Sequence, residues 1–331
     1  MRYAVALLWK ISGWLASHVI ERSAVIERRL GLVLSEADAA ALAAACASCG
    51  RTIGHYYRWY LLKLLFARRW RRATARGLLR AVYSVTSRSS VAAVLEGSGL
   101  EDSRGAVIAI PHHGHYIAAV IAVVEALIAN RTVCVMYGDP RTHPGNDIFD
   151  RICDVLWSGG RTRPVVRLRP DVAGLRAATK ALRAGAALIT FPDVHQDVRA
   201  TYAFRFLGHR LDLKLGSAGL ARSGNAALIP VLARVCEGTG WLLVDPLEPI
   251  YPHADSDSIR LVVDYAATRA MFSRFEQTMA GQILYWQYVR QIYGAPPQLP
   301  RVAANQMEKM LEALIEGNEA SLGVSGGCRA Y

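Results

Sequence analysis

The sequence predicts an α/β fold: one domain with a central sheet, mostly parallel or mixed, flanked by helices and preceded by a helical N-terminal cap. Three observations predict it. The first hundred residues have a helical pattern throughout, and after Glu101 short β-branched runs alternate with helical patterns of roughly 10–15 residues. The 331 residues are 52% hydrophobic, which allows a large core and excludes wholesale disorder.

Residues 1–100 are expected to form a helical region packed on the core. Ser35 is a predicted helix N-cap, with Asp38 three residues later in a capping-box pattern, and the Ala-rich helix that it opens runs to about residue 48. A second helix, predicted at 52–66, is rich in Tyr and Trp. The first twenty residues read as an amphipathic helix that lies on a membrane or packs on the body of the protein.

The charge balance indicates an anionic partner. Lys and Arg outnumber Asp and Glu 39 to 27, a net charge of +12. Such an excess favours nucleic acid, a membrane surface or an acidic carrier protein. The basic segment 68–80 is either a solvated helix face or a surface for lipid headgroups or an acidic helix. No nucleic-acid-binding module is recognisable, so nucleic acid is not expected as a partner.

The α/β core is predicted at 101–300, and 301–331 is expected to be a C-terminal helix followed by a flexible tail. The C-terminal helices are expected at 266–293 and 302–316. The core strands are expected at 106–110, 132–136, 164–168, 186–191, 227–232, 241–244 and 259–263, and the core helices at 116–129, 146–156, 172–184 and 213–223.

Cysteine usage and motif content argue against a metal or a bound cofactor. Six cysteines lack framework spacing, which fits a reducing compartment. Cys46 and Cys49 form a C-x-x-C without a second pair, and two small apolar thiols on one helix face explain them better than zinc or redox chemistry. Because neither a P-loop nor a glycine-rich dinucleotide motif follows a strand, no cofactor is expected.

A histidine cluster after the first strand is the main candidate for catalysis. The strand at 106–110 ends at Pro111, and His112, His113 and His115 occupy the turn before the next helix. Ligands of open α/β sheets bind beyond the carboxyl ends of strands, which is where this turn lies. The histidines could act as a general base, bind a metal or cap the helix; a neutral imidazole suits deprotonation of a hydroxyl or amine.

Two further strand ends are expected to contribute to the same rim. Asp193 follows the strand at 186–191, so it would project beside His112 if both strands belong to one parallel sheet. Asp139, Arg141 and Asn146 follow the strand at 132–136. Convergence of polar residues from several strand ends predicts an active site there.

These blocks resemble the bacterial lipid A late acyltransferases (lauroyl/myristoyl type) of the lysophospholipid acyltransferase superfamily. The resemblance spans nearly the whole chain and includes the His112-His113-Gly114 turn and the Asn146 to Asp150 helix start. Further blocks are residues 185–193, 206–208, 216–222 and 227–230. The resemblance implies transfer of an acyl group from an acyl-carrier-protein or coenzyme A thioester to a hydroxyl or amine, with His112 as the general base.

The sequence departs from this family at two places. The family's His-x4-Asp/Glu signature lacks its acid, because Ile117 stands in that position. The family's Tyr-Arg-Pro block is altered to Tyr137-Gly138-Asp139, which removes an arginine expected to meet an acceptor phosphate. Either Asp193 or Asp139 replaces the acid, or the acceptor is already nucleophilic. The acceptor is therefore expected to be a molecule of a specialised natural-product pathway, such as an amine, and not lipid A.

The expected partners and location follow from the same resemblance. Arg141 and Arg199 are candidates for phosphopantetheine or acceptor-anion contacts, because guanidinium groups suit phosphate. The acceptor would be a small molecule or a lipid, and the protein cytoplasmic or peripheral at the inner face of the inner membrane. Two other functions stay open: a non-catalytic scaffold that binds a carrier protein or a membrane, and a thioester hydrolase on the same fold.

Overall fold

The computed structural model describes residues 104–114, 116–143, 146–157, 165–194, 201–206, 209–235 and 242–279. The predicted N-terminal cap (1–100), the segment 301–331 and the Cys46–Cys49 pair lie outside the described residues. The strand and helix predictions below are therefore assessed for the α/β core alone.

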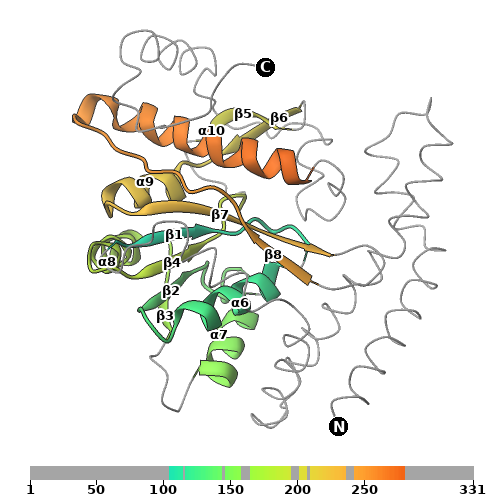
Figure 1. The fold of residues 1–331 in the computed structure, drawn as a ribbon. Helices are drawn as coiled ribbons and strands as arrows, with labels where there is room; N and C mark the ends of the chain where they lie inside the picture. Colours follow the sequence, from blue (N-terminus) through green and yellow to red (C-terminus); the bar gives the residue numbers. More distant parts are fainter. Residues whose placement is uncertain are drawn as a thin grey trace, which may run out of the picture.

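A six-stranded sheet forms the centre of the described core, in the order β3-β2-β4-β1-β7-β8 (Figure 1). Neighbouring strands are parallel from β3 to β7, and β8 joins β7 antiparallel. This confirms the predicted α/β class with a mostly parallel sheet. The strands are β1 (Ala106–Ala109), β2 (Val133–Met136), β3 (Val166–Leu168), β4 (Ala187–Thr190), β7 (Ala227–Val235) and β8 (Leu242–Pro246).

Helices cover both faces of this sheet, which is why its central strands are hydrophobic on both sides. Every residue of β1, β2 and β4 is buried, as is typical of parallel strands between two helical layers. One face packs against α6 (Tyr116–Leu127), α7 (Asp147–Ile152) and its π-helical continuation η2 (Cys153–Trp157). The other packs against α8 (Val172–Arg183), α9 (Gly216–Ser223) and α10 (Arg260–Met279), and Figure 1 shows α9 and α10 on the side opposite α6 and α7.

Local sequence explains the bounds of α8 especially well. The Asp171 side chain accepts a hydrogen bond from the Gly174 amide at 2.7 Å, which satisfies an amide that no earlier turn of the helix can pair. Lys180 and Arg183 lie in the last turn, where cations favour the helix dipole. Gly185 follows with a φ of 82°, a conformation that glycine adopts without strain.

Two elements differ from the sequence predictions. The expected strand at 259–263 is wrong: a 3-10 turn, η3 (Asp257–Ile259), leads directly into α10. A hairpin of β5 (Tyr202–Phe206) and β6 (His209–Leu213) was not predicted, and it shortens the helix expected at 213–223 to α9. The hairpin packs on α10, where Phe204 stacks on Tyr265 with ring centroids 4.6 Å apart.

Among the described residues, none of the helices combines the length and the apolar character that a membrane crossing requires.

Candidate active site

Sheet register places His112 and Asp193 side by side. Strands β1 and β4 are parallel neighbours, and Ala109 pairs with Thr190 at their carboxyl ends. The ladder continues one step, because the Ile110 amide donates to the Thr190 carbonyl at 2.9 Å. A proline then follows in each strand and cannot donate a further ladder hydrogen bond. His112 and Asp193 each stand three positions beyond the Ala109–Thr190 pair, so equal offsets bring them together.

The two residues form a buried hydrogen-bonded pair. The Nδ1 atom of His112 lies 2.8 Å from Oδ1 of Asp193, and the backbone amide of His112 donates to Oδ2 at 2.7 Å. Asp193 is fully buried and His112 is 8% exposed. Because an ionised carboxylate only accepts, Nδ1 of His112 carries the hydrogen, and the lone pair of the neutral ring is on Nε2. Asp193 thus fixes both the backbone and the tautomer of His112.

Aromatic rings hold the imidazole from its sides. The ring of His112 lies 4.6 Å from that of Tyr116 on α6 and 5.0 Å from that of Phe191, measured between centroids. Tyr116 and Phe191 also meet each other edge to face at 6.0 Å. Because these rings come from the first turn of α6 and the end of β4, the orientation of His112 depends on three elements of the core.

His113 has a different environment from His112. It is fully buried, and its Nδ1 lies 3.1 Å from the carbonyl oxygen of Ala233 in β7. A carbonyl only accepts, so Nδ1 of His113 donates this bond. Gly114 follows with a φ of 54°, and a Cβ atom there would lie 2.5 Å from the same carbonyl oxygen. His113 and Gly114 therefore fix the turn against β7, whereas His112 contacts the carboxylate of Asp193.

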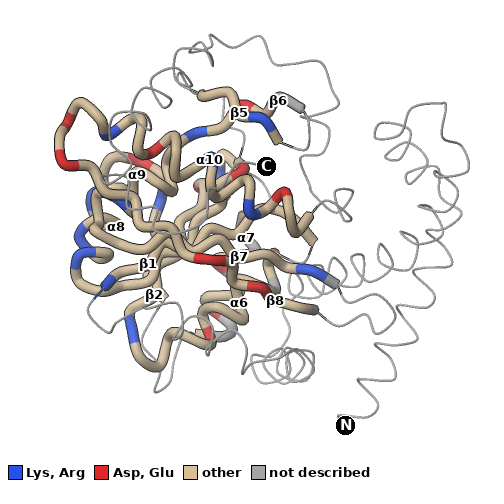
Figure 2. Tube along the Cα trace, turned by 45° about the horizontal axis from the view of Figure 1, so that its top comes forward, with Lys and Arg blue, Asp and Glu red and all other residues tan. Residues whose placement is uncertain are grey.

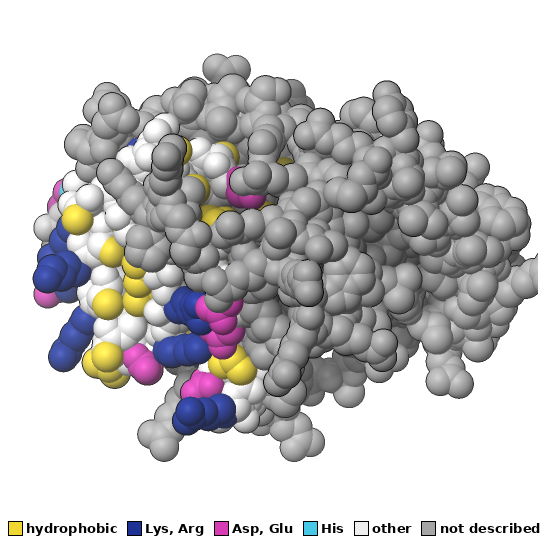
Figure 3. Space-filling view, turned by 90° about the horizontal axis from the view of Figure 1, so that it is seen from below, with side chains coloured by type: hydrophobic (Ala, Val, Ile, Leu, Met, Phe, Trp, Pro, Cys, Tyr) yellow, Lys and Arg dark blue, Asp and Glu magenta, His cyan; other side chains and the backbone are white. Residues whose placement is uncertain are grey.

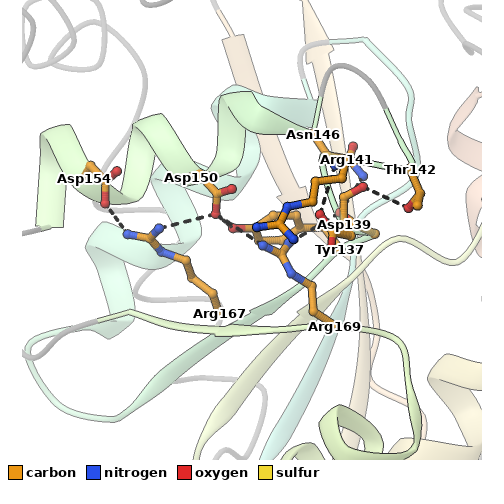
Figure 4. A network of polar contacts seen from close by, with 10 residues as sticks. Tyr137, Asp139, Arg141, Thr142, Asn146, Asp150, Asp154, Arg167 and Arg169 are labelled. Atoms are coloured by element: carbon orange, nitrogen blue, oxygen red, sulfur yellow. Dashed lines mark hydrogen bonds and ion pairs between the residues drawn. The ribbon is translucent and has the colours of Figure 1, made fainter.

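The candidate residues after β2 brace a loop. Oδ1 of Asp139 accepts from the Arg141 amide at 2.9 Å, and the Asp139 carbonyl accepts from the Thr142 amide at 3.0 Å. The Asn146 side chain donates to the Gly138 carbonyl at 3.0 Å, which ties the start of α7 to this loop (Figure 4). The side chain of Arg141 is exposed. Asp193, and not Asp139, is the carboxylate that contacts His112.

A network of arginines and aspartates surrounds Tyr137 at the same rim (Figure 4). The hydroxyl of Tyr137 donates a short hydrogen bond to Asp150, and burial, followed by this bond, raises the pKa of Tyr137. Arg169 lies 4.6 Å from the centroid of the Tyr137 ring and 3.7 Å from the Asp150 carboxylate. Arg167 bridges Asp150, at 3.3 Å, and Asp154. Sequence reasoning missed both arginines, although their spacing of two, at the end of a short predicted strand, was a signal.

Aromatic contacts connect this network to His112. The ring of Phe191, which touches His112, lies 5.2 Å from Phe149, and Phe149 lies 5.0 Å from Tyr137, between ring centroids. The rim therefore has an unbroken row of rings from the imidazole to Arg169. Tyr137 and Phe149 are 4% and 3% exposed, so this row is core packing that connects the arginine network to His112.

Other candidates are placed less fully. His115 and Arg199 lie outside the described residues. Cys134 and Cys153 are buried thiols, and burial raises the pKa of each to about 11, so both are protonated at neutral pH. Within the part of the chain that the structure describes, no three His, Cys, Asp or Glu side chains gather in a way that could hold a metal ion.

Comparison with known proteins adds no assignment: no protein-family model matches the chain, and no match is found among curated proteins. The resemblance to lipid A late acyltransferases therefore stays a prediction, and the functional argument rests on the geometry at His112.

Proposed function

We propose that the protein is an acyltransferase in which His112 is the general base and Asp193 orients it. The observation that carries the proposal is the 2.8 Å contact between Nδ1 of His112 and Oδ1 of Asp193 at the carboxyl ends of two adjacent parallel strands. A carboxylate that holds the Nδ1–H tautomer and stabilises the imidazolium is the arrangement used by hydrolytic triads on unrelated folds. Ligands of open α/β sheets bind at this edge.

The proposed reaction uses the imidazole twice. Nε2 of His112 takes the proton from an acceptor hydroxyl or amine while the acceptor oxygen or nitrogen attacks the thioester carbonyl. The tetrahedral intermediate then collapses, the carbon–sulfur bond breaks, and the imidazolium returns its proton to the leaving thiolate. Asp193 keeps its charge throughout and stabilises the imidazolium. The step needs no oxidant or reductant.

The pair with Asp193 weakens the case for a non-catalytic scaffold. That alternative depended on Ile117, which stands where the resembled family has its acid. A fully buried carboxylate on the neighbouring strand supplies the same chemistry from another direction. A buried carboxylate costs stability unless it is paired, and His112 supplies two hydrogen bonds to Asp193 that offset this cost.

The proposed donor is a carrier-protein or coenzyme A thioester, and the proposed acceptor is a hydroxyl or amine of a specialised pathway. We further propose that the protein works in the cytoplasm, at the inner face of the membrane. This placement rests on the net charge of +12 and on the family resemblance.

Intact-mass spectrometry tests the reaction. The full chain is incubated with an acylated carrier protein and a panel of amines and alcohols, and the masses of carrier and acceptor are followed. We expect the carrier to lose its acyl group and one acceptor to gain it. His112→Asn should abolish transfer, because Asn keeps a side-chain donor toward Asp193 but has no basic nitrogen.

Each other outcome contradicts part of the proposal. Release of free acid without an acceptor would indicate the thioester hydrolase instead. Transfer by His112→Asn at the wild-type rate would refute the base assignment. Binding of the carrier without any acyl loss, across the whole panel, would favour the scaffold. Circular dichroism of each variant shows that the fold is retained.

A further inference from the structure

Helix α8 presents an exposed face that is basic and partly apolar. We define the basic face of α8 as Val172, Leu175, Arg176, Lys180 and Arg183, all of which are exposed. Val172 is 66% exposed and Leu175 40%. Spacings of three, four, eight and eleven residues from Val172 fall on one side of a helix, so these side chains line up along α8. Its opposite side, with Ala178 and Leu182, packs on the sheet.

No acidic side chain balances this face within the helix. Residues 172–183 contain three cations and no Asp or Glu. The nearest acid in sequence, Asp171, is hydrogen-bonded to the Gly174 amide as the helix cap. Arg183 donates to the Ser223 carbonyl, a neutral group, so it keeps a net charge on the surface. Figure 2 shows the basic positions along α8, with no acidic position among them.

The space-filling view shows the charged side chains on this side of the molecule. On the left, where α8 lies in Figure 1, Figure 3 shows Lys and Arg side chains beside hydrophobic ones, with some Asp or Glu at the edge. Nearer the middle of the same view, Lys and Arg side chains lie next to Asp and Glu. The arginine network behaves in this second way, because Arg167 and Arg169 are both paired with Asp150. The basic face of α8 differs from this network in that residues 172–183 themselves contain no Asp or Glu beside their three cations.

The start of α8 lies at the same rim as His112. The helix begins directly after β3, which runs parallel to β2, β4 and β1, so its first turn is beside the carboxyl ends of these strands. Arg169, between β3 and α8, stacks on Tyr137 at the end of the ring row that leads to His112. The first turn of α8, with Val172, Leu175 and Arg176, is therefore the part of the basic face nearest the candidate active site. Lys180 and Arg183 lie in its last turn, toward the opposite edge of the sheet, where the Leu182 carbonyl is close to Gly105.

We propose that the basic face of α8 docks an acidic protein that delivers the substrate. Charge complementarity carries the choice of occupant: cations in a row beside two aliphatic side chains fit an acidic helix with a few apolar positions. A membrane fits less well. Helices that lie in a lipid surface use Trp, Phe or Leu over a broad face, whereas α8 has no aromatic residue and its apolar side is buried on the sheet.

This inference rests on the proposed function, under which the partner is an acyl-carrier protein. The test measures binding and turnover separately, so failure of one is distinguishable from failure of the other. The full chain, the variant Arg176→Glu/Lys180→Glu/Arg183→Glu and the milder Arg176→Glu/Lys180→Glu are titrated with acylated carrier protein. Arg176→Glu alone and Arg269→Glu, one charge reversal at an exposed position on α10, form the matched pair, because each changes the net charge equally. Thermal denaturation checks the fold of each.

We expect the Kd for the carrier to rise at least about tenfold in the triple variant, less in the double, and not in Arg269→Glu. The difference should shrink as salt is raised, because exposed charges are screened. The ratio of KM for the carrier-bound donor to KM for the coenzyme A donor should rise in parallel. An unchanged Kd in the folded triple variant overturns the docking site even if turnover is normal.

A vesicle-binding experiment distinguishes a membrane from a protein as the partner of α8. Sedimentation with vesicles of equimolar phosphatidylglycerol and phosphatidylcholine should be the same for wild type and triple variant. Loss of vesicle binding with unchanged carrier affinity would overturn the proposal in favour of a lipid surface. Loss of carrier affinity in the variants, in a protein that shows no acyl transfer, would keep the docking site and refute the enzyme.

Discussion

Replacing Asp193 with Asn tests the core of the reasoning. The two carboxylate oxygens of Asp193 accept one hydrogen bond each from the backbone amide and the Nδ1 of His112. An Asn side chain has one acceptor oxygen and one NH2 group, so it cannot accept from both donors. Either the backbone amide loses its partner, or the imidazole moves its hydrogen to Nε2 and ceases to be a base.

The expected loss of activity is large compared with the loss of stability. In hydrolytic triads the corresponding change lowers kcat by about 10⁴, or about 5.5 kcal/mol of transition-state stabilisation. One buried donor left without its acceptor costs about 1–3 kcal/mol of folding stability. Asp193→Asn should therefore remain folded at 25 °C and lose about 10³- to 10⁴-fold in kcat/KM.

Turnover by intact-mass spectrometry and urea unfolding together provide the assay. The exposed pair of His253 and Asp255, whose Nε2–Oδ1 distance is also 2.8 Å, offers a matched control. Asp255→Asn should leave both activity and unfolding free energy near wild type, because exposed ion pairs contribute little. If Asp193→Asn were folded and transferred acyl groups within tenfold of the wild-type rate, Asp193 would not be the orienting group.

Three further predictions concern the scaffold of the site. Gly114→Ala should lower the unfolding free energy by at least about 1–2 kcal/mol, because a left-handed backbone alone costs a non-glycine residue this much. The new Cβ would also press on the Ala233 carbonyl oxygen, and an unchanged unfolding free energy in urea would refute this contact. Burial raises the pKa of the Cys134 thiol from 9.0 to about 11, so the folded state is not penalised for this thiol below pH 9 and loses stability as the pH rises to 11. The unfolding free energy of the wild type should therefore fall by about 2–3 kcal/mol more than that of Cys134→Ala between pH 9 and pH 11, as measured by urea unfolding. Arg222 pairs with Asp264 through two 2.8 Å bonds, so Arg222→Ala should cost about 3–5 kcal/mol and Arg222→Lys less, and equal losses would show that geometry is not what matters.

Strand ends were the most predictable part of this molecule. Hydrophobic runs bounded by Pro, Gly or polar residues located β1, β2 and β4 to within about one residue. The meeting of His112 and Asp193 was expected on the condition that their strands shared one parallel sheet, and the structure meets that condition. What the sequence could not supply was the strand order, because pairing of β1 with β4 joins segments far apart in the chain.

The two errors have physical causes. The apolar run at 259–263 is too short to show whether its buried positions repeat every two residues, as in a strand, or every 3.6, as in a helix. The helical spacing becomes evident only from the buried positions that continue along the whole of α10. The β5–β6 hairpin was visible in principle as two alternating runs separated by two residues, one of them Gly208. The contacts of Arg167 and Arg169 with Asp150 depend on how α7 lies over β3, and local sequence does not encode that.

His112 and Asp193 meet because each lies the same number of residues beyond the Ala109–Thr190 pair, so the length of chain after each strand sets their contact. Inserting a single residue between Ala109 and His112 would slide the imidazole by about 3.3 Å and turn it to the opposite side. Chain length is thus constrained at these few positions and in the turn after His112, where His113, Gly114 and Tyr116 hold the pair in place. Under the proposed function, any change of acceptor would have to leave the number of residues between Ala109 and His112 unaltered.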